Sequence, residues 1–298
     1  AGMFDKVKKN AYGYELIEKP NASMQKEDFE EHYYQQCQNN YETVYTDMEI
    51  QFFFNKAAQK EIALKRVWEQ KSGKTRVLDV GCGEGFLLKY FHEKGYEVTG
   101  IDFSQYGITK QNPDLLPYFI QGDLYEVLDQ LATEAEAFDI VNIDSVLDMV
   151  QDARKLLELV KKVLKPDGVL ACKVGNSYSA LQMHLLSDGT LKEEYWVDEK
   201  GHPWYFDKEG FLALLRDHGY QCEDLYSEGL AEFFLFHELT NYYENPKVGK
   251  ACYKAKIRLE NMMHQISAQQ TNEVMRQLAK MGIGRELAGI FRLCAPKA

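Results

Sequence analysis

The feature that most constrains this chain is a short apolar run that passes directly into a glycine-rich loop. Residues 77–80 read Val-Leu-Asp-Val, a pattern typical of an interior strand of a parallel sheet. Residues 81–85 then read Gly-Cys-Gly-Glu-Gly, and glycines let the chain turn sharply while a ligand approaches the main chain. Helical periodicity over 86–94 places a helix N-terminus, with free amides, behind the loop. The segment predicts a nucleotide-binding loop.

The acids of this segment indicate which kind of nucleotide it binds. A dinucleotide-binding loop would have a further glycine where this chain has Phe86. It would also avoid a carboxylate beside a pyrophosphate, because like charges repel at short range. Asp79 and Glu84 therefore favour a ligand that carries cationic groups and no phosphates. S-adenosylmethionine has this chemistry, with an ammonium, a sulfonium and an adenosine.

Two further acids follow the next two expected strands. Residues 96–101 are predicted to form a strand that ends in Asp102, about twenty residues after the glycine loop begins. A carboxylate there can accept hydrogen bonds from both ribose hydroxyls, and Phe103 can lie against the adenine face. The alternative is that Asp102 only caps a helix that begins near Ser104. A third strand is predicted over 117–121.

The pattern of these elements resembles a known family. Further strands are expected at 138–144, 169–174, 221–226 and 289–294, with an amphipathic helix over 149–164 and a Leu-Lys-Pro-Asp-Gly turn at 164–168. With the glycine loop and the acids, these features make residues 75–226 similar to the class I S-adenosylmethionine-dependent methyltransferases. The resemblance implies an α/β, Rossmann-like, doubly wound sheet with strand order 3-2-1-4-5-7-6 and the last strand antiparallel.

The same resemblance implies the cofactor, S-adenosylmethionine, and the residues that hold it. An acid after the third strand, here Asp123, accepts the adenine amino group, and the amide of the next residue, Leu124, meets the ring. The residues expected to contact the cofactor are Asp79, Gly81, Cys82, Gly83, Gly85, Asp102, Phe103, Asp123, Leu124 and Asp144.

Four segments are expected along the chain. They are an N-terminal helical cap over 1–71 with helices at 26–38 and 48–71, a Rossmann-like core over 72–230, a helical insertion over 231–284 and the final core strand within 285–298. Four tyrosines of the cap can close over the methionine end of the cofactor, or simply pack the cap: Tyr33, Tyr34, Tyr41 and Tyr45.

Composition disfavours several classes of partner. The formal net charge of −11 argues against DNA, because nucleic-acid-binding proteins usually carry a basic surface. No apolar run approaches membrane-spanning length and no secretory signal is evident, so no membrane insertion is expected. The six cysteines have no metal-ligand spacing, which is typical of reduced thiols and predicts a cytoplasmic protein without a metal site.

The segment after the fifth expected strand is predicted to contact the methyl acceptor. Residues 175–205 mix aromatic, amide and histidine side chains, as expected for a sugar or another small polar compound. With residues 202–206 and 282–285, this segment resembles methyltransferases of bacterial sugar and surface-polysaccharide pathways. The insertion also carries basic residues that can hold the phosphates of a nucleotide-sugar, although a solvated face or a homodimer contact explains them equally well: Lys247, Lys250, Lys254, Lys256, Arg258 and Arg285.

Methylation of a hydroxyl needs alignment of the acceptor and a general base. The candidates are Asp144, Asp148 and His202. Asp148 can accept a proton or hold the methionine ammonium, but it can also be only an acid favoured by the dipole of a helix N-terminus. His202 lies in an expected loop, where a neutral imidazole suits proton abstraction, although most isolated histidines are not catalytic.

Other reactions are disfavoured, and two other functions stay open. Residues 144–147 lack the proline pair of enzymes that methylate exocyclic base nitrogens. Cys82 and Cys172 lie in the loop and in a strand, unlike the exposed nucleophile that methylation of a pyrimidine carbon requires. The open alternatives are a methyltransferase that acts on protein or RNA, with the insertion as docking surface, and a non-catalytic cofactor-binding subunit.

Overall fold

The computed structural model describes residues 5–28, 44–70, 72–134 and 138–294. Their centre is one sheet made of β3 (Arg76–Val80), β4 (Glu97–Asp102), β5 (Phe119–Gln121), β6 (Phe138–Asp144), β7 (Leu164–Gly175), β9 (Tyr220–Glu228) and β10 (Glu286–Leu293). The strand order is β5-β4-β3-β6-β7-β10-β9. β10 pairs antiparallel with β7 and with β9, whereas β3 to β7 pair parallel. This is the predicted order, and the predicted fold class is confirmed.

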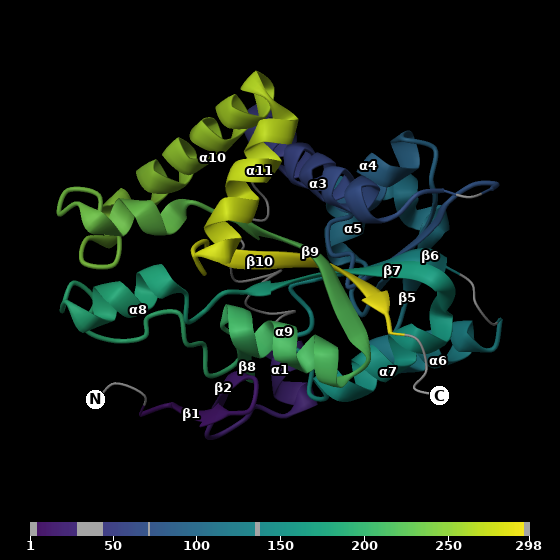
Figure 1. Ribbon diagram of the computed structural model, residues 1–298, viewed down its shortest axis with the longest axis horizontal. Helices are drawn as coiled ribbons and strands as arrows, with labels where there is room; N and C mark the ends of the chain where they lie inside the picture. Colours follow the sequence, from purple (N-terminus) through teal and green to yellow (C-terminus); the bar gives the residue numbers. More distant parts are fainter. Residues whose placement is uncertain (1–4, 29–43, 71, 135–137, 295–298) are drawn as a thin grey trace.

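Helices cover both faces of this sheet (Figure 1). One layer contains α3 (Asp47–Val67), α4 (Phe86–Glu93), α5 (Tyr106–Gln111), α10 (Gly249–Ile266) and α11 (Ala268–Lys280), and the other contains α6 (Leu124–Ala132), α7 (Ala153–Val163) and α9 (Lys208–Asp217). Successive strand residues point to opposite faces. Val77 and Ile140 pack in one core, and Leu78 and Val141 pack in the other. The near-continuous apolar strands of the sequence therefore reflect burial on both sides.

The N-terminal unit contains a β-hairpin in addition to the expected helices. β1 (Val7–Asn10) and β2 (Gly13–Leu16) pair antiparallel, and β2 also pairs with β8 (Trp204–Tyr205). A short helix follows, α1 (Ala22–Asp28), and the rest of the helix predicted over 26–38 lies outside the described residues. The prediction of a purely helical cap missed the hairpin, although Val7 and Leu16 are buried. Four-residue strands give too short a pattern to recognise in the sequence alone.

Several element boundaries differ from those predicted. The 3₁₀ helix η2 (Pro113–Tyr118) takes the start of the expected third strand, because prolines stand at both 113 and 117. α7 begins at Ala153 rather than at 149, since Asp152 caps it by accepting from the amide of Lys155. The segment 175–205 contains a helix that was not predicted, α8 (Ala180–Ser187), and the insertion begins with the short 3₁₀ helices η3 (Ala231–Phe236) and η4 (Pro246–Val248).

None of the helices in the described part of the chain has the length and apolar character that a membrane span requires.

The hairpin lies so close to α9 that only glycine fits at the contact. A Cβ on Gly210 would lie 2.0 Å from the carbonyl oxygen of Tyr12. We expect Gly210→Ala to lower the free energy of unfolding by about 1–3 kcal/mol, because the backbone cannot yield to the added methyl group. Gly249→Ala is the matched control, since a Cβ there would meet only the side chain of Tyr242, at 3.9 Å. Urea unfolding of both variants checks this, and equal stabilities would contradict it.

Candidate active site

The glycine loop is fixed to the neighbouring strand by its own backbone. The amides of Gly81 and Cys82 both donate to the carbonyl of Ile101, at 2.8 and 2.9 Å. Gly81, Gly83 and Gly85 all have positive φ, between +54° and +81°, so the loop needs glycine at these turns. A Cβ on Gly83 would meet nothing within 4 Å, so the backbone at this position borders open space. A ligand can therefore approach the main chain there.

Asp102 lies directly beside this loop. Its Oδ2 accepts from the amide of Gly83 at 2.9 Å, and its Oδ1 accepts from the amide of Ser104 at 3.1 Å. The carboxyl group is buried, and burial raises its pKa. It does not cap α5, because Gln105 occupies that N-cap position. The alternative reading as a helix cap is thus not observed, and Asp102 faces the loop as the cofactor prediction requires.

A buried lysine joins the other two acids of the carboxyl edge. Lys60 of α3 is 2% exposed, forms a short ion pair with Asp144 and donates to Oδ1 of Asn142 at 2.6 Å. Asn142 in turn donates to Oδ1 of Asp79 at 2.8 Å. Burial and the nearby charge of Asp144 raise the pKa of Asp79 to about 7. Three acids and one lysine give this edge excess negative charge, which suits a cationic ligand.

Lys60 and Asn142 were not among the predicted site residues. A signal for Lys60 existed, since it stands between Ala57 and Leu64, which are both buried on the inner face of α3. A lysine on such a face is unusual without a buried acid to meet it. Asn142 gave no signal of its own, because a single amide inside a strand is equally consistent with a structural role.

The residues expected around adenine lie at the ends of β4 and β5. Oδ1 of Asp123 accepts from the amides of Tyr125 and Glu126, at 3.0 and 3.1 Å, so Asp123 is the N-cap of α6, and Leu124 is the first residue of that helix. The ammonium of Lys26 in α1 lies 5.9 Å from the ring centroid of Phe103. The roles of these residues toward adenine stay predictions.

The N-terminal unit contacts both sides of the site. The hydroxyl of Tyr45 donates to Glu84 in the glycine loop at 2.8 Å, and its ring packs edge-on against Phe86. Gln25 of α1 donates to the carbonyls of Met149 and Gly201, at 2.8 and 2.9 Å. Tyr33, Tyr34 and Tyr41 lie outside the described residues. The described part of the cap therefore reaches both the cofactor loop and the loop after β6.

Two of the three candidate bases lie together and the third does not. Oδ2 of Asp148 accepts from the amide of Gly175 at 3.2 Å and lies 3.8 Å from Nδ1 of His202. Asp148 is 6% exposed, and its Oδ1 has no hydrogen-bond partner within the described residues. Because Asp152 caps α7, the helix-dipole explanation of Asp148 does not hold. Asp144 faces Lys60 instead, and its predicted contact with the cofactor stays a prediction.

Cys82 and Cys172 are buried, and burial raises the pKa of both thiols well above the ordinary range. Both are therefore protonated, inert side chains of the core. The described residues contain no group of three or more His, Cys, Asp and Glu side chains that could hold a metal ion.

Comparison with known proteins places the chain in a family. The model of a methyltransferase domain matches residues 50–225, more than half of the chain. The chain belongs to the methyltransferase domain family. Membership of this family confirms that part of the prediction, and the strand order of the sheet agrees with it.

Individual relatives are more distant. The chain is 38% identical over 101 residues to the ubiquinone biosynthesis O-methyltransferase of Haemophilus ducreyi, which covers 32% of this chain and 43% of that protein. The protein of the same name from Pasteurella multocida is 30% identical over 122 residues, covering 37% and 50%. The chain thus spans about half the length, or less, of these curated relatives.

Solved structures show the same fold over most of the chain. The plantazolicin methyltransferase BpumL in complex with SAH superposes with a TM-score of 0.52 at 17% identity, covering 91% of this chain and 94% of that one. Its complex with SAH and a monoazolic desmethylPZN analog has a TM-score of 0.50 at 18% identity, with coverages of 92% and 95%. At this identity the likeness concerns the fold alone.

The residues present fit S-adenosylmethionine. The open backbone at Gly83 and the buried carboxyl group of Asp102 suit the adenosine, and the excess of acids over Lys60 suits the sulfonium and the ammonium.

We expect Asp102→Ala to weaken binding of the cofactor at least tenfold, because the ribose hydroxyls lose their acceptor. Calorimetric titration with S-adenosylmethionine checks this. Asp129→Ala, an exposed acid of α6, is the control, and equal affinities of the two variants would refute the role of Asp102.

Asp79 predicts a characteristic pH dependence of stability. A carboxyl group whose pKa is about 7 in the folded protein binds its proton more tightly than in the unfolded chain, where the value is 3.8. The stability that the protonated carboxyl group contributes is therefore fully present below about pH 4 and is lost as the pH rises through 7. Compared with Asp79→Asn, the ligand-free protein should lose up to about 4 kcal/mol of stability between pH 4 and pH 8. Denaturant unfolding of both proteins at several pH values measures this loss. A stability difference between them that does not change with pH would contradict the prediction.

Proposed function

We propose that the protein transfers the methyl group of S-adenosylmethionine to a hydroxyl of a small polar acceptor, a sugar or a sugar-like metabolite. The observation that carries the proposal is the contact between Asp148 and His202 at the carboxyl edge of the sheet, near the acids assigned to the cofactor. The cofactor supplies an electrophilic methyl carbon, so the chain's own task is to align the acceptor and to receive its proton.

His202 is the general base of this proposal and Asp148 is its positioning residue. The side chain of His202 is 35% exposed, so its imidazole can meet an acceptor. Because Nδ1 faces the Asp148 carboxylate, the carboxylate favours a proton on Nδ1 and leaves Nε2 as the acceptor of the hydroxyl proton. The same carboxylate stabilises the imidazolium that forms. The 3.8 Å separation would shorten when the ring becomes charged.

The cofactor side of the proposal assigns roles to the remaining residues. Asp102 accepts the ribose hydroxyls, Asp79 and Asp144 face the positively charged methionine end, and the backbone of the glycine loop borders the adenosine. Lys60 holds the carboxylate of Asp144 in place through their ion pair.

The names of the curated relatives support a hydroxyl as the methyl acceptor, but they also favour a second kind of hydroxyl compound. Both relatives are called ubiquinone biosynthesis O-methyltransferases, so a phenolic hydroxyl is the alternative to a sugar hydroxyl. The polar and aromatic side chains of the segment after β7 support the sugar: Asn176, Gln182 and Trp196 are buried there, and each has a side-chain polar atom without a hydrogen-bond partner in the described structure.

The insertion supplies basic side chains and an exposed apolar face to this proposal. Lys256 lies over the ring of Phe52, and Arg285 interacts with buried Glu232. Binding of the phosphates of a nucleotide-sugar would therefore fall to the other four basic residues of the insertion. A homodimer through the insertion would cover apolar side chains that are now exposed, Leu259, Met262, Ile266 and Val274.

The proposed base is tested by substitution. With an accepted substrate, His202→Gln should lower kcat about 10²–10⁴-fold, and Asp148→Asn should lower it in the same direction and change the pH profile of kcat. The dissociation constant of S-adenosylmethionine should change less than twofold in both. His184→Gln replaces a more exposed histidine, which pairs with Asp188, and is the control. The rates are measured by mass spectrometry as formation of SAH from S-adenosylmethionine in the presence of each member of a panel of monosaccharides and catechols. Retention of full kcat in His202→Gln would remove it as the base.

A further inference from the structure

Gln25 of α1 joins the two loops that carry the proposed base pair. Its Nε2 donates to the carbonyl of Met149 at 2.8 Å and to the carbonyl of Gly201 at 2.9 Å. Met149 directly follows Asp148 in the chain, and Gly201 directly precedes His202. One amide group therefore spans the two segments whose side chains lie 3.8 Å apart, from Oδ2 of the aspartate to Nδ1 of the histidine.

Both ends of this amide are engaged, so its orientation is fixed. While Nε2 meets the two carbonyls, Oε1 of Gln25 accepts from Nε2 of Gln151 in a short hydrogen bond. Gln151 is itself held, because the same Nε2 donates to the carbonyl of Pro20 at 3.0 Å. An inverted Gln25 amide would turn its oxygen toward two carbonyl oxygens, which have no proton to donate. The side chain is therefore a double donor between the two loops.

The segment around His202 is attached to the loop after β6 on both of its sides. Before the histidine, the attachment is the amide of Gln25. Beyond it, the backbone amide of Trp204 donates to the carbonyl of Asp148 at 3.4 Å, and the indole Nε1 donates to the carbonyl of Val150 at 2.7 Å. Trp204 belongs to the same segment as the histidine, whereas Gln25 comes from a separate helix. The attachment before the histidine therefore depends on the docking of α1.

The loop after β6 needs such contacts, because its backbone begins in an unfavourable conformation. Ser145, the first residue after β6, has a φ of +55° and is the one non-glycine residue with a positive φ in the described ranges. Residues with side chains disfavour this conformation, and it persists where the surroundings hold the chain in place. The hydrogen bonds to the carbonyls of residues 148–150 contribute to that hold. Loss of one of them should therefore displace Asp148.

Attachment of the N-terminal unit to the core does not depend on Gln25. β2 pairs with β8, and Val7 and Leu16 of the hairpin are buried. By contrast, α1 has no buried residue, so apolar packing does not decide where this helix lies. The contacts of Gln25 are thus available to position the two loops rather than to hold the unit on the core.

We propose that Gln25 is a positioning residue for methyl transfer. Through the backbone of the two loops it keeps His202 against Asp148, so that the imidazole carries its proton on Nδ1 and presents Nε2 to the acceptor hydroxyl. This inference rests on the proposed function for the role of His202 as the base. The hold on the histidine ring is independent of methyl transfer and can be measured without turnover.

The first test is Gln25→Glu, which keeps the length of the side chain and removes both donors. Its carboxylate can still accept from Gln151 but would repel the two carbonyl oxygens, so the loops should move apart. The readout is the tautomer of His202, from ¹⁵N spectra of histidine-labelled protein in complex with SAH at about pH 8.5, where an ordinary imidazole is neutral. His202 should carry its proton on Nδ1 in the unmodified protein. In the variant it should shift toward the Nε2 tautomer, because Asp148 no longer faces the ring.

Two further variants and a control complete this test. Gln25→Ala removes the donors without adding a charge and should shift the tautomer in the same direction. Gln25→Lys returns N–H donors to this position and should restore the Nδ1 tautomer at least in part. Gln51→Glu is the matched control, since Gln51 of α3 is exposed and donates to Asn55, and it should leave the tautomer unchanged. A tautomer of His202 that is the same in the unmodified protein, in Gln25→Glu and in Gln25→Ala would overturn the inference.

The second test separates positioning of the base from a general effect on the fold. With the fastest substrate of the monosaccharide and catechol panel, Gln25→Glu should lower kcat about tenfold, because a small misplacement of a catalytic group slows the reaction steeply. The dissociation constant of SAH should change less than about threefold. In the His202→Gln background the same substitution should change kcat less than about twofold, since the base that it positions is already absent. Tenfold losses in both backgrounds would overturn the positioning role.

The two tests also distinguish this inference from the proposed function. If His202→Gln keeps full kcat while Gln25→Glu still shifts the tautomer, His202 is not the base and the proposed function fails. The hold of Gln25 on the ring would stand in that case.

Discussion

The ion pair between Lys60 and Asp144 holds the active-site edge together. Asp79, Asp102 and Asp144 lie at or next to the carboxyl ends of β3, β4 and β6, and without a cation their mutual repulsion would favour protonation or separation of the carboxylates. Lys60 comes from α3, a helix outside the minimal sheet, so docking of that helix brings the compensating charge. Breaking a buried pair leaves an uncompensated charge and is strongly destabilising, which ties the N-terminal unit to the cofactor edge.

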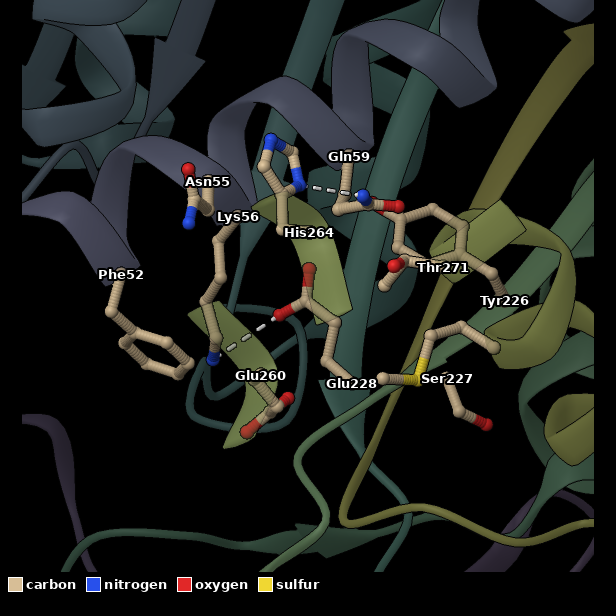
Figure 2. Close-up of a pocket in the computed structure, with 11 residues that line it drawn as sticks. Phe52, Asn55, Lys56, Gln59, Tyr226, Ser227, Glu228, Glu260, His264 and Thr271 are labelled. Atoms are coloured by element: carbon tan, nitrogen blue, oxygen red, sulfur yellow. Dashed lines mark hydrogen bonds and ion pairs between the residues drawn. The ribbon is translucent and has the colours of Figure 1, made fainter. Parts of the chain in front are cut away.

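The same principle governs the far side of the edge. Lys173 of β7 lies 3.0 Å from Glu228, and Lys56 of α3 lies 3.4 Å from the same carboxylate. The two lysines lower the pKa of Glu228 to about 2, although its burial acts in the opposite direction. One helix thus supplies two lysines, one turn apart, to two separate acidic clusters on one sheet edge. Glu260 belongs to the same cluster (Figure 2), where burial raises the pKa of its carboxyl group against the charges of Lys56 and Lys256.

Local patterns predicted the sheet well because each strand is covered on both faces and its sequence is apolar throughout. The positions of Asp79 and Asp102 followed from strand ends, since parallel strands bring their carboxyl ends to one edge. The hairpin Val7–Leu16 and the lysines of α3 could not be predicted in the same way. Their partners, Tyr205 for the hairpin and Asp144 or Glu228 for the lysines, are far away in sequence, and only the tertiary arrangement decides which buried charges meet.

The cap also connects the two halves of the proposed reaction. Tyr45 donates to Glu84 on the cofactor side, whereas Gln25 donates to Met149 and Gly201, which are next to Asp148 and His202 on the acceptor side. Met149 and Gly201 each adjoin one member of the proposed base pair, so these two hydrogen bonds from α1 help to hold Asp148 and His202 at their 3.8 Å contact.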